Sequence, residues 1–490
     1  MKKFLLTYFL GVGCWWVANT QGLDDIVRYS FQSDVSSARA LSVGGSLNSL
    51  GADFSCTSGN PAGIALFRGN ELLLSPSFNL QKVGAELLNT DIQGETFTNQ
   101  TKFTLPGFGM VFVSQPRGRN KIEAFNFALG FNQLSNFNQQ FRYSGSSKGS
   151  IMQWYQNLAN NFGVDHFDAG MASDAQSMIY YENEDYYGID YDEAPDELIF
   201  KSQEVITSGS VNEFVLSFGA NVNEKIMLGA TMGIPFITFN RFKTYSEEDP
   251  GEGLDGNIPY FQNLVVRENL TTTGLGINLK LGMIFRFSQA LRFGVAFHSP
   301  TVLNLEDTYR NSMEYTYLDG DLITGEGTTP DGLFSYSMVT PWKAMADFGY
   351  IIGKSGFITA QIMYLNYGNS RFKFADFPQD ELTANAEIKD FLNQAVNLKF
   401  GGEIAIENFR VRGGVSFFPS AYLGDVTQTL GIHFGLGYRF SKFYIDLGYR
   451  NTSNNQRYAP YYLDLPDVSQ PLVDKNDQSN LLMFTLGSRF

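Results

Sequence analysis

The chain has 490 residues, a length that suggests two or three soluble domains unless it forms one large β-barrel. Charged residues make up only 17%, whereas aromatic residues reach 15% and there are 49 glycines. This composition disfavours a helical protein and favours many strands that pack aromatic rings. The net charge of −15 argues against a nucleic-acid partner, which would require a basic surface.

Residues 1–22 have the pattern of a secretory signal peptide. Lys2 and Lys3 precede an apolar run at residues 4–12 that is too short to cross a bilayer. We expect cleavage at the end of this segment, and Cys14 leaves lipoprotein processing open as an alternative. No later stretch reaches the roughly 18 consecutive apolar residues of a membrane helix.

From residue 71 onward, apolar and polar residues alternate. In the segment 429–440 the even positions are apolar or aromatic, and the odd positions are Thr, Gly, His and Arg. Because successive strand side chains point to opposite faces, one face of each strand is apolar and the other is small or charged. Repetition of such segments is typical of a membrane β-barrel. Fourteen strands are predicted to begin near residues 71, 106, 121, 211, 225, 263, 290, 332, 355, 392, 408, 427, 442 and 479.

The connections between these strands alternate in length. Tight turns are predicted at 221–224, 287–290, 353–355, 407–408 and 441–442, and long loops at 81–105, 146–210, 243–262, 309–331, 373–391 and 452–478. Short turns on one side and long loops on the other predict both termini in the periplasm. The expected fold is therefore all-β: a 14-stranded antiparallel transmembrane β-barrel over residues 71–490, in contact with the lipid and lipopolysaccharide of a bacterial outer membrane. The C-terminal Phe490 shares the outward parity of Phe484, which resembles the assembly signal of outer-membrane barrels.

Residues 23–70 precede the first strand and do not alternate. This segment contains Gly44-Gly45, Asp53 and Asn60-Pro61-Ala62, and two short motifs follow farther along, His298-Ser299-Pro300-Thr301 and Thr340-Pro341-Trp342. With these motifs the chain resembles the FadL-type family of outer-membrane long-chain fatty acid and hydrocarbon transporters, whose N-terminal segment forms a hatch. Together with the fourteen strands, these motifs extend the resemblance over essentially the whole mature chain.

The resemblance implies a hatch inside the barrel and passive uptake of hydrophobic small molecules, gated by that hatch and without a cofactor. A barrel of fourteen strands would leave an open lumen unless something fills it. Irregular backbone rich in Gly, Ser, Ala and Asn is allowed there because it does not face lipid. The alternative for Asn60-Pro61 is an ordinary surface turn before the first strand.

The 146–210 loop is the longest, and its apolar residues are candidates for capturing a solute outside the cell. Methionine and aromatic side chains suit adaptable apolar binding. The alternative is that they pack the loop onto the barrel mouth. Eight acids at 182–197 are expected to form a solvated loop, because their spacing does not match a calcium-binding loop. The candidate capture residues are Trp154, Tyr155, Phe162, Phe167 and Met171.

Two arginines are candidates for contacts inside the barrel. Arg410 and Arg412 have inward parity just after a tight turn, so they could hold a fatty-acid carboxylate by paired hydrogen bonds. The alternative, which we favour, is that they form ion pairs that tie the hatch to the wall. Asn132 and Gln133 interrupt the third strand and are candidates for a break that opens the wall sideways, as the family resemblance implies.

Two other classes of function compete with transport. A barrel enzyme would need Ser and His on its outer surface for nucleophilic catalysis, but only His166, His298 and His433 exist and the last two have inward parity. The stronger rival is a non-transporting barrel that acts as a subunit or docking partner in a secretion or surface-assembly complex. Its protein partner would bind the outer loops.

Overall fold

The structure is a computed structural model that describes residues 22–31, 35–88, 90, 94–115, 121–251, 256–463 and 470–490. The predicted signal peptide lies, apart from Gly22, outside the described residues. Within the described ranges, no helix is long and apolar enough to cross a bilayer.

Helices occur only before the wall strands and in the loops between them. They are α1 (Leu23–Ser30), α2 (Ala38–Ser42), η1 (Phe54–Thr57), η2 (Pro61–Leu66), α3 (Ile151–Phe162), α4 (Asp168–Asp174), η3 (Asp190–Glu193), η4 (Tyr367–Asn369) and α5 (Pro378–Phe391). The strands are β1 (Glu71–Leu87), β2 (Thr96–Ser114), β3 (Ile122–Asn136), β4 (Gln139–Ser147), β5 (Ile179–Tyr181), β6 (Tyr186–Gly188), β7 (Ile199–Val222), β8 (Ile226–Glu248), β9 (Phe261–Arg286), β10 (Leu291–His298), β11 (Val302–Asp319), β12 (Asp321–Thr328), β13 (Gly332–Val339), β14 (Lys343–Ile352), β15 (Gly356–Asn366), β16 (Arg371–Lys373), β17 (Gln394–Ile406), β18 (Phe409–Pro419), β19 (Gln428–Arg439), β20 (Phe443–Tyr458) and β21 (Val473–Arg489).

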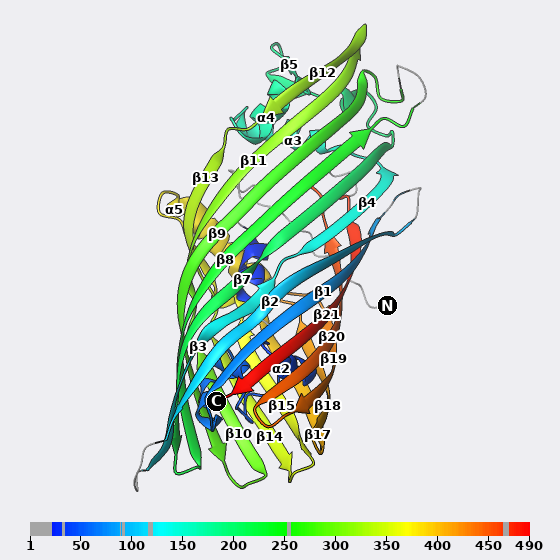
Figure 1. The fold of residues 1–490 in the computed structure, drawn as a ribbon. Helices are drawn as coiled ribbons and strands as arrows, with labels where there is room; N and C mark the ends of the chain where they lie inside the picture. The colour runs from blue at the N-terminus through cyan, green and yellow to red at the C-terminus, as the bar shows by residue number, and fades with distance from the viewer. Residues whose placement is uncertain are drawn as a thin grey trace, which may run out of the picture.

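Fourteen wall strands close into one antiparallel barrel (Figure 1). Four of them are interrupted: β3 is continued by β4, β10 by β11, β13 by β14, and β15 by β16. The ring closes where β21 pairs with β1, from Glu71–Arg489 to Leu87–Val473. The predicted 14-stranded barrel is confirmed.

The outer face of the wall is apolar, as the alternation predicts. Leu275, Ile277, Phe434 and Leu436 are 54–58% exposed, whereas the neighbouring His433 points inward and is 2% exposed. In a closed ring every backbone group of the wall can pair with an adjacent strand, which hydrocarbon requires. The exposed apolar side chains therefore form the surface that faces lipid.

Short turns join the strands at one end of the barrel. Between β7 and β8, Asn223 and Glu224 have φ values of 52° and 54°, the left-handed conformations of a type I′ hairpin turn. At the same end, the backbone N–H of Phe490 donates to the carbonyl of Asn70 at 3.1 Å. Short turns identify this end as periplasmic, and the long loops at the other end as extracellular.

Several strands are longer than predicted. β2 begins at Thr96 instead of near 106, β7 at Ile199 instead of near 211, and β21 at Val473 instead of near 479. The predicted loops at 81–105 and 309–331 are therefore largely strand, and the one at 452–478 is strand at both ends. Beyond the hydrocarbon both faces of a strand meet water. The strands therefore continue to pair there, but their side chains no longer alternate between apolar and polar. Residues 101–103 of β2, for example, are all exposed.

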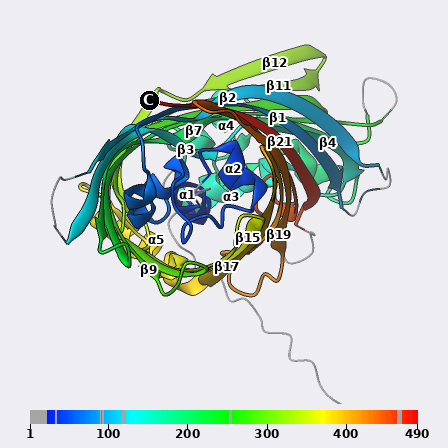
Figure 2. The same ribbon diagram turned by 60° about the horizontal axis from the view of Figure 1, so that its bottom comes forward.

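The N-terminal segment lies inside the ring of strands (Figure 2). It consists of α1, followed by residues 35–67, which contain α2, η1 and η2 and are called the hatch core below. Most residues of the hatch core are fully buried, including polar ones such as Ser42, Ser49 and Asn60. The lumen is therefore filled by this segment and the inward side chains of the wall.

Candidate functional site

Glycines of four adjacent strands form a socket for α2 and the turn after it. Gly401 on β17, Gly414 on β18, Gly435 on β19 and Gly448 on β20 face the lumen. A Cβ at Gly414 would lie 2.6 Å from the backbone nitrogen of Gly44, and one at Gly448 would lie 2.6 Å from the carbonyl oxygen of Ala38. Since real Cβ atoms do not approach backbone so closely, only glycine allows the hatch core to touch the wall here.

Gly44 and Gly45, two of the predicted hatch residues, make the turn that follows α2. Their φ values are 69° and 80°, a conformation that favours glycine. This turn places the backbone of Gly44 against the carbonyls of Phe400 and Val415. The two glycines therefore shape the segment that enters the socket.

The predicted triplet Asn60-Pro61-Ala62 occupies a second socket. Asn60 caps η2, because its side-chain oxygen accepts from the N–H of Ala62 at 3.1 Å, while its amide nitrogen donates to the carbonyls of Met283 and Val295 at 3.3 and 3.2 Å. The glycines that receive η2 and its cap are Gly219, Gly229, Gly282 and Gly294, on β7, β8, β9 and β10. Asn60 thus joins the hatch core to two neighbouring wall strands, a role beyond the turn chemistry that the sequence predicts.

Asp53, the remaining predicted hatch residue, holds the hatch core together. Its carboxylate accepts from the N–H of Ser55 at 3.0 Å, which caps η1, and from the hydroxyl of Ser37 at 2.8 Å. Ser37 in turn caps α2. One carboxylate therefore fixes the relative position of two helical turns.

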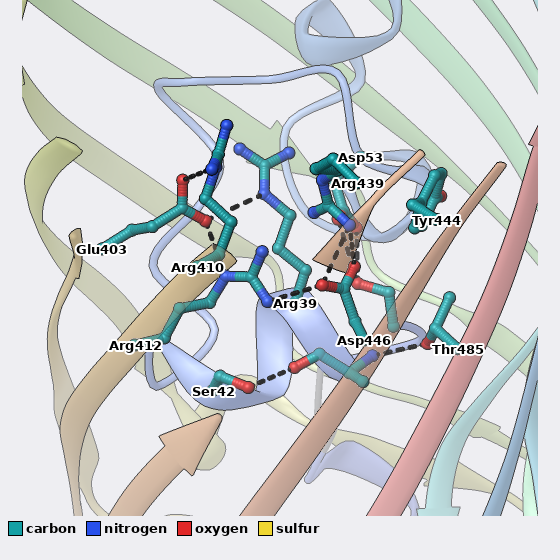
Figure 3. Close-up of polar contacts among 12 residues, drawn as sticks. Arg39, Ser42, Asp53, Glu403, Arg410, Arg412, Arg439, Tyr444, Asp446 and Thr485 are labelled. Atoms are coloured by element: carbon teal, nitrogen blue, oxygen red, sulfur yellow. Dashed lines mark hydrogen bonds and ion pairs between the residues drawn. The ribbon is translucent and has the colours of Figure 1, made fainter. Parts of the chain in front are cut away.

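Arg412 lies in a network of ion pairs that connects four wall strands, β17 to β20 (Figure 3). Its Nε lies 2.6 Å from Glu403 on β17, and its Nη1 lies 2.7 Å from Asp446 on β20. Arg439 also pairs with Asp446, at 2.9 Å. To bind Arg412, a solute carboxylate would have to displace the fully buried Asp446 and the partly buried Glu403.

The hatch core joins this network through Arg39. Its Nε lies 4.0 Å from Glu403, and its Nη1 donates to the carbonyl of Ala52 at 3.1 Å. Arg410 pairs more loosely with Glu403, at 3.6 Å, and donates to the carbonyl of Glu407 in the adjacent periplasmic turn. These contacts favour ion pairs within the wall over carboxylate binding for both predicted arginines, and Glu403 connects them to Arg39 of the hatch core.

A second polar cluster anchors the hatch core to the opposite wall, and its central residue Glu213 was not among the predicted site residues. The buried carboxylate of Glu213 on β7 pairs with Lys280 on β9 and accepts from the hydroxyl of Ser58 at 2.9 Å. The side chain of Asn132 donates to Ser58 at 2.7 Å, and Nε2 of His298 hydrogen-bonds the carbonyl of Gly59 at 2.7 Å. Polar residues at inward positions of the strands were the only signal for these contacts.

In its outer half the lumen is apolar, and α1 fills it. Ile26 and Tyr29 on one face of α1 are 0% and 1% exposed. Arg28 lies over the ring of Phe239, with its guanidinium carbon 4.2 Å from the centroid. The wall and loop residues that pack around α1, called the chamber below, are Leu134, Val211, Ile237, Phe239, Leu270, Leu303, Leu305, Tyr336, Met338, Leu365, Tyr367, Phe372, Phe374, Ile388, Leu392, Ala395 and Ala421.

Polar contacts hold both ends of α1. The hydroxyl of Tyr422 donates to Asp24, and Nζ of Lys343 on β14 donates to the carbonyl of Ser30 at 3.0 Å. Asp25 forms an ion pair with Arg28 one turn later, and burial raises the pKa of Asp25 to about 6. Because the Asp25 carboxylate is buried when α1 docks in the chamber, the docking of α1 depends on whether Asp25 is protonated.

Most of the predicted capture residues lie in the core of an extracellular cap made by residues 148–198. Tyr155 and Met171 are 3% and 1% exposed. Trp154 packs edge-on against Tyr155, with centroids 4.7 Å apart, and Phe167 packs on Tyr309 of β11 at 5.7 Å. Only Phe162 among the five predicted residues is exposed, so the structure favours the packing alternative for the other four.

The acidic side chains of the cap fall into two groups, those bonded to other cap and wall residues and those exposed to solvent. Across the described ranges, no group of three or more His, Cys, Asp or Glu side chains is placed to hold an ion. Instead, Asp190 accepts from the hydroxyl of Tyr315 at 2.7 Å and Asp192 from the amide of Gln156 at 2.6 Å. Some of the predicted acidic residues thus anchor the cap, and others, such as Glu182 and Glu184, are exposed.

A seam in the wall lies beside the predicted break at Asn132 and Gln133. Pairing between β2 and β3 extends from Ser114–Phe125 only to Gly107–Asn132, and the next residue of β2, Pro106, has no N–H to donate. Beyond that point β3 has a register shift at 133–135, and β4 pairs only with β7 among the described strands. The outer half of β2 is therefore not paired with β3 or β4.

No family model matches the sequence, and no curated protein matches it. Among solved structures, a FadL homologue of Pseudomonas aeruginosa superposes with a TM-score of 0.56 at 12% identity, covering 94% of this chain and 100% of the other. The toluene transporter TodX of P. putida superposes with a TM-score of 0.50 at 11% identity, covering 89% and 94%. The chain has the FadL-type fold. The predicted resemblance is confirmed at the level of the fold, which is that of an outer-membrane β-barrel.

Proposed function

We propose that the protein is an outer-membrane channel for passive uptake of hydrophobic small molecules and that α1 is its gate. The observation that carries this proposal is the apolar chamber, since the lumen of a water-filled pore is polar. Ile26 and Tyr29 of α1 occupy the position that an apolar solute would take. Removal of α1 would leave a cavity lined by aliphatic and aromatic side chains, the environment that binds apolar ligands.

The chamber suits long or flat apolar solutes such as fatty acids or aromatic hydrocarbons. Rings of Phe239, Tyr336, Phe372 and Phe374 line it, and such surfaces bind flat solutes through stacked and edge contacts. TodX, which has the same fold, is described as a toluene transporter. A solute that leaves the chamber would reach the outer half of β2, where the seam offers a sideways route through the wall.

The hatch core stays in place in this mechanism. Two glycine sockets and two polar clusters hold it, whereas α1 is held by a few polar contacts and its apolar face. Solute and α1 therefore compete for one set of apolar contacts, and the free energy of solute binding offsets the loss of α1 docking.

Uptake by cells that express the protein tests this function. Leu305 is buried in the chamber wall, and Leu305→Asn would place an unpaired amide there, which costs about 1–3 kcal/mol. We expect the initial rate of oleate or toluene uptake to fall by about ten-fold relative to wild type. Leu322→Asn is the control because Leu322 is 55% exposed on β12, outside the chamber. Equal uptake by wild type, both variants and cells without the protein would contradict a transport role.

A further inference from the structure

The extracellular end of the barrel extends into a tall sheet. β7, β8 and β9 have 24, 23 and 26 residues, and the β11–β12 hairpin continues this sheet at one side (Figure 1). The cap packs on the sheet through an apolar core that includes Tyr155, Met171 and Met313. The sheet is thus supported on one face well outside the lipid.

β12 is the free edge of this sheet. It pairs with β11 from Asp319–Asp321 to Ser312–Thr328, and within the described part of the chain it has no second partner strand. Just beyond β12, the backbone N–H of Thr329 donates to the carbonyl of Asn311 at 3.0 Å, and the N–H of Asn311 donates to the side-chain hydroxyl of Thr329 at 3.0 Å. Because bonded positions alternate along an antiparallel ladder, the backbone N–H and C=O groups of Leu322, Thr324 and Glu326 point away from β11.

Helix α4 makes this edge rigid. A Cβ at Gly327 would lie 3.0 Å from the backbone nitrogen of Ala175, and one at Gly325 would lie 2.7 Å from its carbonyl carbon. One face of β12 is therefore in contact with the end of α4, whereas Leu322, Thr324 and Glu326 are exposed on the other. A preformed edge of this kind binds an added strand at a lower entropic cost than a flexible loop would.

The surroundings of the edge carry the negative charge of the molecule. Residues 148–201 and 310–331 hold 16 of the 50 acidic residues and only three of the 35 basic ones, Lys148, Lys201 and Arg310, so they contribute −13 to the net charge of −15. Asp319, Asp321 and Glu326 belong to the β11–β12 hairpin itself. Such a field favours cationic partners and disfavours anionic ones.

We propose that β12 binds an extended, basic segment of a partner polypeptide by strand addition. Backbone groups of Leu322, Thr324 and Glu326 form the ladder with the added strand, which is the general basis of affinity in this mode. The acidic hairpin and cap select lysine and arginine side chains on that strand. This inference does not depend on transport, because the edge lies outside the chamber.

A peptide-binding assay on the full-length protein in lipid nanodiscs tests the proposal. The probe is a capped, fluorescent peptide of eight residues in which lysine alternates with valine, and its counterpart carries glutamate in place of lysine. We expect saturable binding of the lysine peptide only, weakened by salt because the attraction is electrostatic. Failure of the lysine peptide to bind would overturn the proposal.

The backbone ladder is tested by Thr324→Pro. Proline removes an outward N–H without touching the backbone bonds to β11, because the backbone of Thr324 does not bond to that strand. The hydroxyl of Thr324 lies 3.0 Å from that of Thr316 on β11, and this contact is lost in Thr324→Pro and in the valine control alike. We expect binding at least about ten-fold weaker than wild type, whereas Thr324→Val, which keeps the N–H, binds within about two-fold. Heat-modifiable migration and the protease resistance of the cap show that both variants are folded.

Charge selection is tested by Glu326→Lys, which should weaken binding of the lysine peptide and allow binding of the glutamate peptide. Equal binding of the lysine peptide by wild type and Thr324→Pro would show that the acidic surface attracts cations without strand addition. That result overturns the proposal, while leaving the transport function untouched.

Discussion

The hydroxyl oxygens of Ser46 in the hatch core and Thr359 on β15 lie 2.7 Å apart, and both residues are buried. This contact lies beside the glycine socket, where a Cβ at Gly45 would lie 3.5 Å from Nζ of Lys399. Because the hydroxyl oxygens of Ser46 and Thr359 are so close, cysteines at these two positions should be able to form a disulfide bond. The pair therefore reports whether the hatch core moves during uptake.

The double variant Ser46→Cys/Thr359→Cys should form a disulfide that locks the hatch core to the wall. Since α1 alone is the proposed gate, we expect oxidised and reduced protein to take up oleate at rates within about two-fold of each other. The native Cys56 is buried, and the single-cysteine variants control for its participation. A rate that falls by more than about ten-fold on oxidation and recovers with a reductant would show that the whole hatch moves.

Gly414→Ala should loosen the hatch core. The added methyl meets the backbone nitrogen of Gly44 at 2.6 Å, and neither backbone can yield without a shift in α2 or β18. Overpacking of this kind costs about 1–3 kcal/mol. Hydrogen exchange of the backbone amides at residues 38–45 should therefore be faster than in wild type.

Gly413→Ala is the matched control for that variant. Gly413 precedes Gly414 on β18 and faces the opposite side, and a Cβ there meets its nearest atom, the carbonyl oxygen of His433, at 3.9 Å. We expect its hydrogen exchange to equal that of wild type. Equal exchange in Gly414→Ala and Gly413→Ala would mean that the hatch core is not seated against this socket.

The alternation of side chains made the barrel predictable, whereas the contents of the lumen were not. Phe434 and His433 point outward and inward as their parity requires, because lipid on one side and protein on the other impose opposite chemistry at every second residue. Above the membrane both faces of a strand meet water, so side chains no longer alternate between apolar and polar. For this reason residues 101–103 of β2 were predicted as part of a loop.

Contacts inside the lumen depend on positions far apart in the sequence. Asn60 was recognisable as a turn residue, but its partners Met283 and Val295 are more than two hundred residues away. The α1 helix carries its apolar residues Ile26 and Tyr29 in a short segment with no alternation. Its place in the chamber follows only from the closed wall.

Docking of α1 should weaken as pH rises through about 6. Burial raises the pKa of Asp25 from 3.8 to about 6, with Arg28 and Arg241 opposing that shift and Asp307 and Asp24 adding to it. The docked state therefore binds this proton more tightly than the released state. The resulting stabilisation is full below about pH 4 and is lost as pH rises through about 6.

Oleate uptake should consequently be faster at about pH 7.5 than at about pH 5. Asp25→Asn removes the titrating group, so its ratio of rates between the two pH values should be smaller than that of wild type. Oleic acid also titrates near this range, and toluene, which does not, serves as the second solute. An unchanged ratio for toluene in Asp25→Asn would exclude Asp25 as the origin of the pH dependence.

Thiol labelling of Ile26→Cys in outer-membrane vesicles tests the gate most directly. Ile26 is fully buried against the chamber, so a cysteine there should react slowly with a water-soluble maleimide while no solute is present. Addition of oleate or toluene should displace α1 and increase the labelling rate by about ten-fold or more. An equally slow rate with saturating solute, in vesicles that take up that solute, would contradict the claim that α1 leaves the chamber.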